Sequence, residues 1–306
     1  MNILTKVTFT FSALLVGAAS FAQNPIMNDQ AKTATDNQSE AVNSIWKPTL
    51  VEDGIIDRVE HDNALLPIHK IREIDIAWKA TVWRIIDIKQ KQNMAFRYTG
   101  DQYTGGGAFI EILNDAVSRG KIHAYSNVDD RFTTPLDMAA FKKQIGGDKD
   151  TTWVTDPITG EPVARIRNNY FNVNSVTQYE VKEEWIFDRN RGHMVVQIVG
   201  IAPLQDVLDP MTGQYVSSSP MYWLYYPDLR KILANYEVYN PRNDMRRMTW
   251  TDFLDGHYYE SYVMKTSMNN PFGAPIPDYG KSLRALSQGQ NDLNNIIHRE
   301  MDMWEE

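Results

Sequence analysis

The 306-residue chain contains no cysteine, so a catalytic thiol, a thiolate metal site and a disulfide are all excluded. Two common hydrolase signatures are also missing: the His-Glu-x-x-His pair of helical zinc enzymes and the Gly-x-Ser-x-Gly nucleophile turn. The glycine-rich segment YTGGGAF (103–109) has neither the spacing nor the lysine of a nucleotide-binding loop, so we expect a hinge there. We therefore expect no catalytic residue, no metal and no cofactor.

Basic residues are fewer than acidic ones. Lys and Arg number 31 against 39 Asp and Glu, which gives a formal net charge of −8. Nucleic acid is therefore not expected as a partner, because its phosphates attract basic surfaces. With 42% hydrophobic residues the chain can form a sizeable core. Its eight tryptophans and fifteen tyrosines suit either that core or a broad protein interface, and composition leaves both open.

Long apolar stretches are scarce as well, and the main one lies at 7–21, after a weakly basic start with Lys6. Small residues around Ala22 follow it, which predicts a secretory signal peptide at 1–22. A membrane anchor is the alternative, but the stretch is short for a span of about 20 residues. We expect the mature chain in the periplasm. Residues 23–45 are rich in Gln, Asn, Thr and Ser, which predicts a disordered leader.

The first half of the remaining chain predicts helices around one hairpin. Apolar residues at helical spacing indicate a helix from Pro67 to Val82, followed by a hairpin over WRIIDI, KQKQN and MAFRY (83–98). A helix that continues through Ile88 is the alternative. A second helix is expected at 109–120, a short strand at 122–125, and a third helix capped by Thr134 that runs to Gly146.

The second half predicts more strands. Residues 179–188 alternate, 189–192 form a turn, and 193–202 form a buried strand that Pro203 stops. A strand at 221–226 and a helix at 227–234 follow. Thr251 or Asp252 is expected to cap a helix that runs to about Lys265, and residues 281–304 form a polar helix. The turn sequences DPITG (156–160) and DPMTG (209–213) indicate loops.

These elements indicate an α+β fold of antiparallel hairpins with flanking helices. We expect a core at 46–280 and a C-terminal helix at 281–306. Residues 111–138 and 231–253 share an order of helix, short strand, acidic turn and helix start. They suggest two degenerate repeats, at 65–146 and 175–266, with chance similarity as the alternative.

The carboxylates do not form an evident catalytic pair. Glu183 and Glu184 are adjacent in an expected strand, so their side chains point to opposite faces. Asp129 and Asp130 lie in an expected turn, where Asp is common. His193 suits a strand start better than a ligand or a base. A glycosidase assembled from distant carboxylates stays open as an alternative.

Three blocks of this sequence resemble the GldN/PorN family. They are IREIDIAWKATVWRIIDIKQKQN (71–93), KEEWIFDRNRGHMVVQIVGIAPL (182–204) and MYWLYYPDLRKILANYEVYNPRND (221–244). The tryptophans, the GIAP turn and the W-x-Y-Y-P-D-x-R block carry the resemblance together. It implies a periplasmic component of the type IX secretion and gliding-motility apparatus of Bacteroidetes, with no catalytic residues.

The resemblance also implies partners. The family assembles with an outer-membrane lipoprotein of the GldK/PorK type into a periplasmic ring, which places it at the inner face of the outer membrane. The periplasmic part of a GldM/PorM-type motor protein is a further expected partner, and the ring requires self-association. A periplasmic hydrolase or a carbohydrate-binding protein is the alternative function from another class.

Tryptophan, tyrosine and arginine dominate interface hot spots, so two blocks are the candidate partner surface. Because strand side chains alternate, about half of such a set should face the core instead. The candidates are Trp223, Tyr225, Tyr226, Arg230, Arg246, Arg247 and Trp250.

The double substitution Arg246→Glu/Arg247→Glu is expected to weaken binding of the lipoprotein partner, because it reverses two charges of a residue type that is frequent in hot spots. A pull-down measures the binding, while circular dichroism and thermal melting of the same sample should stay unchanged. Undiminished binding would remove this pair from the interface.

Overall fold

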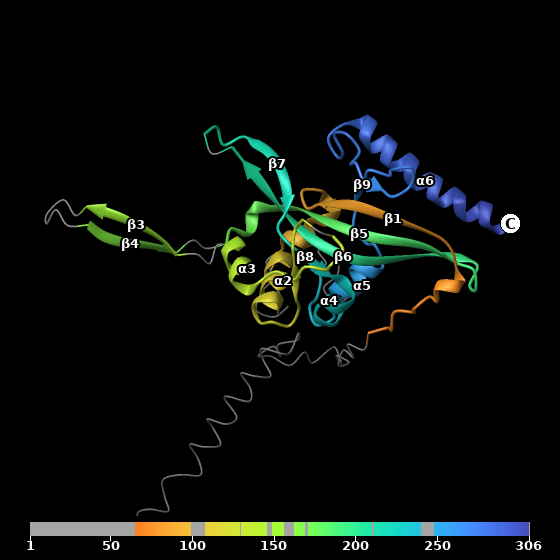
Figure 1. Ribbon diagram of the computed structural model, residues 1–306, viewed down its shortest axis with the longest axis horizontal. Coiled ribbons are helices and arrows are strands. Elements are labelled where there is room, and N and C mark those ends of the chain that lie inside the picture. The colour runs from red at the N-terminus through yellow and green to blue at the C-terminus, as the bar shows by residue number, and fades with distance from the viewer. Residues whose placement is uncertain are drawn as a thin grey trace, which may run out of the picture.

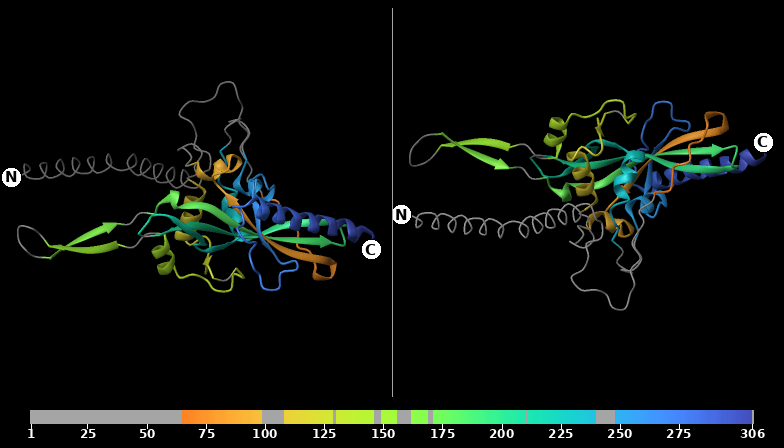
Figure 2. Two further views of the ribbon diagram at one scale, coloured as in Figure 1. Left: turned by 90° about the horizontal axis from the view of Figure 1, so that it is seen from above. Right: turned by 90° about the horizontal axis from the view of Figure 1, so that it is seen from below.

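The computed structural model describes residues 65–98, 108–128, 130–145, 149–155, 162–168, 171–209, 211–239 and 248–305. The expected signal peptide and leader lie outside these ranges. The described residues form an α+β fold, as expected, in which one antiparallel sheet of seven strands carries helices (Figure 1). The sheet order is β2-β8-β6-β5-β1-β9, and β7 pairs with β6. A separate two-stranded sheet, β3-β4, lies well away from the main one (Figures 1 and 2).

The strands have the following bounds: β1 Ile76–Asp87, β2 Ala124–Tyr125, β3 Lys149–Thr155, β4 Pro162–Asn168, β5 Val176–Asp188, β6 His193–Leu208, β7 Tyr215–Pro220, β8 Trp223–Tyr225 and β9 Tyr262–Thr266. The helices are α2 Phe109–Ser118, α3 Met138–Gln144, α4 Tyr226–Leu233, α5 Trp250–Asp255 and α6 Leu283–Glu305. The described residues also form three short 3-10 helices, η1 Glu73–Asp75, η2 Lys91–Arg97 and η3 Val173–Ser175.

Strand β5 is the centre of the sheet. It pairs with β1 from Ile76↔Asp188 to Asp87↔Gln178, and with β6 from Val176↔Gln205 to Asp188↔His193. The expected turn at 189–192 between β5 and β6 is confirmed, and Gly192 takes the left-handed conformation there (φ 68°). Because both edges of β5 are paired, its side chains must find partners above and below the sheet.

One face of β1 and β5 is covered by two neighbouring clusters. Ile86 packs in a large cluster with residues of η2, α2, α4 and α5. Val82, four residues earlier and therefore on the same face, packs against Ala285 and Ile296 of α6. The opposite face carries a smaller cluster that contains Ile85. The sheet thus has two hydrophobic clusters side by side on one face and the smaller Ile85 cluster on the other.

The expected helix at 67–82 is wrong. Residues 66–72 have no regular structure, η1 follows, and the rest is β1. Apolar side chains at Trp78, Ala80 and Val82 also fit strand alternation, and pairing of β1 with both β5 and β9 decides between the two patterns. The alternative of a helix through Ile88 is wrong for the same reason. The second arm of the expected hairpin is the 3-10 helix η2.

Three expected boundaries also differ. Strand β6 continues through Pro203 to Leu208, at the point where its neighbour changes from β8 to β7, and the Pro203 carbonyl accepts a hydrogen bond from Met221. Pro135 forms an isolated bridge with Tyr125, so α3 begins later, after Asp137. The strand expected at 221–226 shortens to β8 because Tyr226 opens α4.

The expected helix from Thr251 to about Lys265 ends at Asp255. Gly256 follows, and His257 takes a positive φ of 50°, which stops the helix and turns the chain toward β9. The N-cap is Thr249, two residues before Thr251 and three before Asp252, the two expected caps. Helices α2, α4 and α6 and the left-handed Gly120 after α2 agree with the sequence pattern.

The two expected repeats share one local arrangement. In the first, Tyr125 bridges Pro135 shortly before α3, and in the second, Glu237 bridges Thr249 directly before α5. The hairpin of β5 and β6 has no counterpart directly after β1, where η2 follows instead. The division into duplicated halves stays a prediction.

The α5 N-cap provides a direct test of local stability. The Thr249 hydroxyl accepts a hydrogen bond from the Asp252 amide at 3.1 Å and donates to the Asp252 carboxylate at 2.9 Å. Thr249→Ala is expected to lower the free energy of unfolding by about 1 kcal/mol, whereas Thr249→Ser should keep most of it. Urea unfolding measures both variants, and equal stability of the alanine and wild-type chains would contradict the cap.

Candidate functional site

Most of the described residues proposed for the partner surface are buried in the fold. Trp223, Tyr226 and Trp250 are each only 2% exposed. The Trp250 ring lies 4.5 Å from the ring of Phe109, centroid to centroid, within the large cluster. Three of the seven candidates therefore offer almost no side-chain surface to a partner in this fold.

The other candidates differ in position. Arg230 is 9% exposed, and Tyr225 is half-buried on β8. Arg246 and Arg247 lie outside the described residues. Only Tyr225 among the described candidates therefore keeps substantial accessible surface, and its assignment to an interface stays a proposal.

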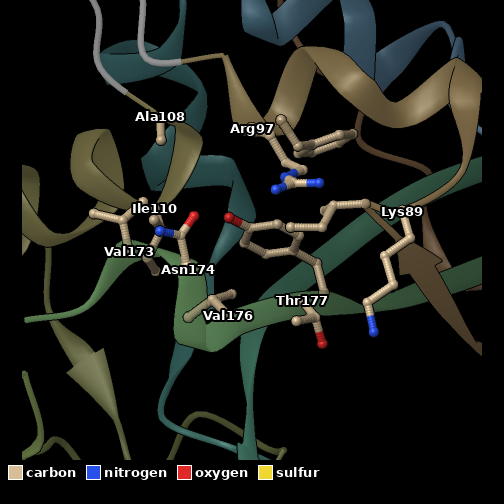
Figure 3. A pocket seen from close by; sticks show the side chains of 11 residues that line it. Lys89, Arg97, Ala108, Ile110, Val173, Asn174, Val176 and Thr177 are labelled. Carbon is tan, nitrogen blue, oxygen red and sulfur yellow. The ribbon is translucent and has the colours of Figure 1, made fainter.

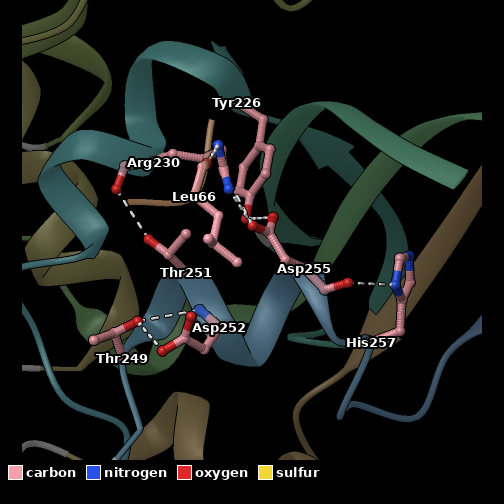
Figure 4. A network of polar contacts seen from close by, with 8 residues as sticks. All are labelled: Leu66, Tyr226, Arg230, Thr249, Thr251, Asp252, Asp255 and His257. Atoms are coloured by element: carbon pink, nitrogen blue, oxygen red, sulfur yellow. Dashed lines mark hydrogen bonds and ion pairs between the residues drawn. The ribbon is translucent and has the colours of Figure 1, made fainter. Parts of the chain in front are cut away.

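Arg230 and Tyr226 converge on Asp255, and they join α4 to the end of α5 (Figure 4). Arg230 Nη2 donates to Asp255 Oδ2 at 2.6 Å and Nε to the same oxygen at 3.0 Å, while the Tyr226 hydroxyl donates to Oδ1 at 2.6 Å. Arg230 Nη1 also donates to the Leu66 carbonyl at 3.2 Å. Charge-assisted bonds of this kind are strong, so Arg230 fixes three segments rather than awaiting a partner.

A second polar cluster surrounds Glu183, whose side chain is fully buried on β5. Trp185 Nε1 donates to one carboxylate oxygen at 3.1 Å and the Tyr259 hydroxyl to the other at 3.3 Å. Arg84 Nη1 lies at 3.8 Å and His257 Nε2 at 3.4 Å. Burial alone would raise the pKa of Glu183, but the hydrogen bond from His257 and the charge of Arg84 outweigh it and lower the pKa.

The Glu183 cluster holds the loop after α5 onto the centre of the sheet. No substrate can reach this carboxylate, because its side chain is completely covered. Glu184, its neighbour, forms a 2.7 Å ion pair with Lys79 instead, so the two glutamates do not act together, as the alternation predicted. Sequence reasoning missed Arg84, His257 and Tyr259, which come from distant parts of the chain.

Glu180 is a third buried carboxylate, 6% exposed, on the opposite face of β5 from Glu183. Burial raises its pKa to about 7, the charges of Lys265 and Lys182 oppose this, and Asp130 adds to it. Lys182 itself donates to the Asp130 carbonyl at 2.8 Å, so Asp130 is engaged by a neighbouring strand. Asp130 also accepts from Trp83 Nε1 at 2.8 Å.

A small pocket of about 190 Å³ lies between η2, the start of α2 and the start of β5 (Figure 3). Its lining includes the apolar Ile110, Val173 and Val176 and the basic Lys89 and Arg97. The backbone of Ile110 hydrogen-bonds the hydroxyl of the buried Tyr179, whose pKa burial raises. Of the glycine-rich segment expected as a hinge, residues 103–107 lie outside the described residues.

Helix α6 carries five of the large hydrophobic side chains that are exposed among the described residues. Ala285 and Ile296 are buried against the sheet. At about 100° per residue, a second set of apolar side chains falls within about 60° of one another beside that buried face. This α6 stripe comprises Leu283, Leu286, Ile297, Met301 and Trp304, of which Leu283 (84%), Met301 (64%) and Trp304 (67%) are the most exposed.

The described residues contain no group of three His, Asp or Glu side chains that could hold a metal ion. Within the same ranges, none of the helices combines the length and the apolar character that crossing a bilayer requires.

Glu180 makes folding stability depend on pH. Its pKa is about 7 in the folded chain against a usual value of 4.5, so its stabilising contribution is complete below pH 4.5 and is lost as the pH rises through 7. Glu180→Gln should therefore gain stability relative to wild type between pH 5 and pH 8, by up to about 3 kcal/mol. Urea unfolding at both pH values measures this, with the exposed Glu73→Gln as control. If the free energies of unfolding of wild type and Glu180→Gln differ by the same amount at pH 5 and pH 8, the burial argument is contradicted.

Comparison with known protein families finds a match, and it spans the sheet and the helices described above. The family model described as "Gliding motility associated protein GldN" matches residues 71–305, from just before η1 to the end of α6. No match was found among curated proteins. Since the family model covers most of the chain, the protein belongs to the GldN family, a component of the gliding-motility and type IX secretion apparatus.

Proposed function

We propose that this protein is a non-enzymatic structural subunit of a periplasmic ring of the type IX secretion and gliding apparatus. It binds an outer-membrane lipoprotein of the GldK/PorK type, which holds it at the inner face of the outer membrane. It associates with itself around the ring, and it meets the periplasmic part of a GldM/PorM-type motor protein. The observation that carries the proposal is the α6 stripe.

The α6 stripe supports protein binding because its side chains are large, apolar and exposed. Met301 and Trp304 belong to the residue types that are enriched at protein interfaces. Exposed apolar side chains that gather on one element mark contact sites more often than scattered ones do. Trp304 also lies beside Gly192 of the β5–β6 turn, so the end of the helix is placed against the sheet.

The projecting hairpins support assembly with neighbours. The β6–β7 hairpin projects from the main sheet (Figure 1), and β3–β4 stands clear of that sheet (Figures 1 and 2). Strand β7 is paired only with β6 among the described strands, so its other edge can accept a strand or loop from another subunit.

The polar clusters support a structural role over catalysis. The Arg230–Asp255 pair and the Glu183 cluster hold α4, α5 and the following loop to the sheet, and Glu183 is inaccessible. A buried charge that loses its partner costs several kcal/mol, so these groups are committed to the fold. Tyr225, Arg246 and Arg247 remain proposed contributors to the partner surface.

The test is a pull-down of the full-length mature chain by its lipoprotein partner. Leu283→Lys/Met301→Lys is expected to weaken the interaction at least about tenfold, because it places two charges in an apolar contact. Gln288→Lys/Asn295→Lys adds the same charge to exposed positions of α6 away from the stripe and should bind as wild type does. Thermal melting must be unchanged for both variants.

Equal binding by the two variants would remove the α6 stripe from the partner interface. Failure of the wild-type chain to bind any lipoprotein of this type would contradict the proposed function itself.

A further inference from the structure

A cavity of about 420 Å³ lies beside the smaller cluster that contains Ile85, and Tyr262 and Tyr279 of that cluster line it. It is open to solvent on one side and is bordered by the end of β1, the start of β5, β7 and the turn at 278–281 that leads into α6. Its lining residues are Asp87, Lys89, Thr177, Gln178, Asp206, Tyr215, Val216, Ser217, Ser218, Tyr262, Asp278, Tyr279, Gly280 and Lys281. This volume falls in the range of small-molecule sites, and neither the family nor the proposed function accounts for it.

The polar groups of the cavity are already held in position. Asp206 accepts hydrogen bonds from Thr177 Oγ1 at 2.9 Å and from Ser218 Oγ at 2.9 Å. Ser218 Oγ lies 2.8 Å from the Tyr215 hydroxyl, so β5, β6 and β7 are joined at this wall. Such a network fixes donors and acceptors at the cavity surface before any ligand arrives.

Three tyrosines supply the aromatic walls. The ring centroids of Tyr262 and Tyr279 lie 6.4 Å apart with an interplanar angle of 33°. Gln178 Nε2 donates to the Tyr262 hydroxyl at 3.1 Å. Tyr215 is 45% exposed, and Lys281 Nζ lies 4.9 Å from its ring centroid. The cavity therefore combines ring faces with hydroxyl, amide and ammonium donors.

The turn at 278–281 is shaped to press against this wall. Gly280 has φ 70°, and a Cβ there would come within 2.3 Å of the Tyr262 ring. Only glycine lets the backbone approach the ring so closely. Asp278 also takes a positive φ of 54°, which Asp and Asn tolerate better than other residues.

Charge at the cavity is nearly balanced. Asp87, Asp206 and Asp278 face two lysines, Lys89 and Lys281, so neither an anion nor a cation is strongly selected. Closely placed carboxylates, hydroxyls and amides beside tyrosine rings match the alternating hydroxyl groups and C–H faces of a sugar. We propose that this cavity binds a neutral saccharide, a function beyond the proposed assembly role and independent of it.

The test titrates the full-length mature chain with saccharides and monitors binding by saturation-transfer NMR. The probes are a tetrasaccharide of β-1,4-linked N-acetylglucosamine, as in cell-wall glycan, and the β-1,4-linked glucose tetrasaccharide, as in non-acetylated polysaccharides. Binding of either supports the saccharide site, and the probe that binds identifies the source. Absence of binding by both at about 10 mM, a concentration above the weakest useful affinity, overturns it.

Two variants locate the binding. Tyr215→Ala is expected to weaken it at least about fivefold, because it removes an exposed aromatic wall. Tyr258→Ala removes a similarly exposed tyrosine (51%) outside the cavity and should bind as wild type does. Equal affinity of the Tyr215→Ala and wild-type chains overturns the site, provided that circular dichroism shows both to be folded. If Tyr215→Ala unfolds, the saccharide affinity is measured on Asp278→Asn instead. Asn tolerates the positive φ of this position, and removal of the charge is expected to weaken binding.

Discussion

Strand β5 is the constraint on which the rest of the structure depends. Its two edges are paired with β1 and β6 almost from end to end, so it cannot present either edge to solvent. Its side chains must therefore be covered on both faces. On one face this cover comes from the helices of the large cluster and, next to them, from α6.

The central position of β5 also explains its buried charges. Glu183 can be ionised there because Arg84, His257, Trp185 and Tyr259 surround it, whereas Glu180 has a raised pKa on the other face. Removing one partner from such a cluster leaves an unpaired charge, which is far more costly than losing a surface ion pair. The ionised Glu183 is thus committed to holding the sheet together, whereas burial disfavours the ionised form of Glu180.

The sequence predicts those elements whose local signals agree with their packing. The turn before His193, the helix α2 with its terminal Gly120 and the long helix α6 are of this kind. The segment before Val82 was misread because its apolar spacing fits both a helix and a strand, and only pairing with β5 and β9 decides. Trp223 and Trp250 could not be assigned to the core, because the rings that cover them, Phe132 and Phe109, come from remote segments.

The central claim is that this chain acts by assembling with other proteins. The most direct test is the mass of the mature chain when it is co-expressed with its lipoprotein partner and purified with it, followed by negative-stain microscopy. The account predicts a large, closed assembly that contains both chains in many copies. A monomer of the mature chain that never joins the lipoprotein, in spite of a stable fold, would contradict it.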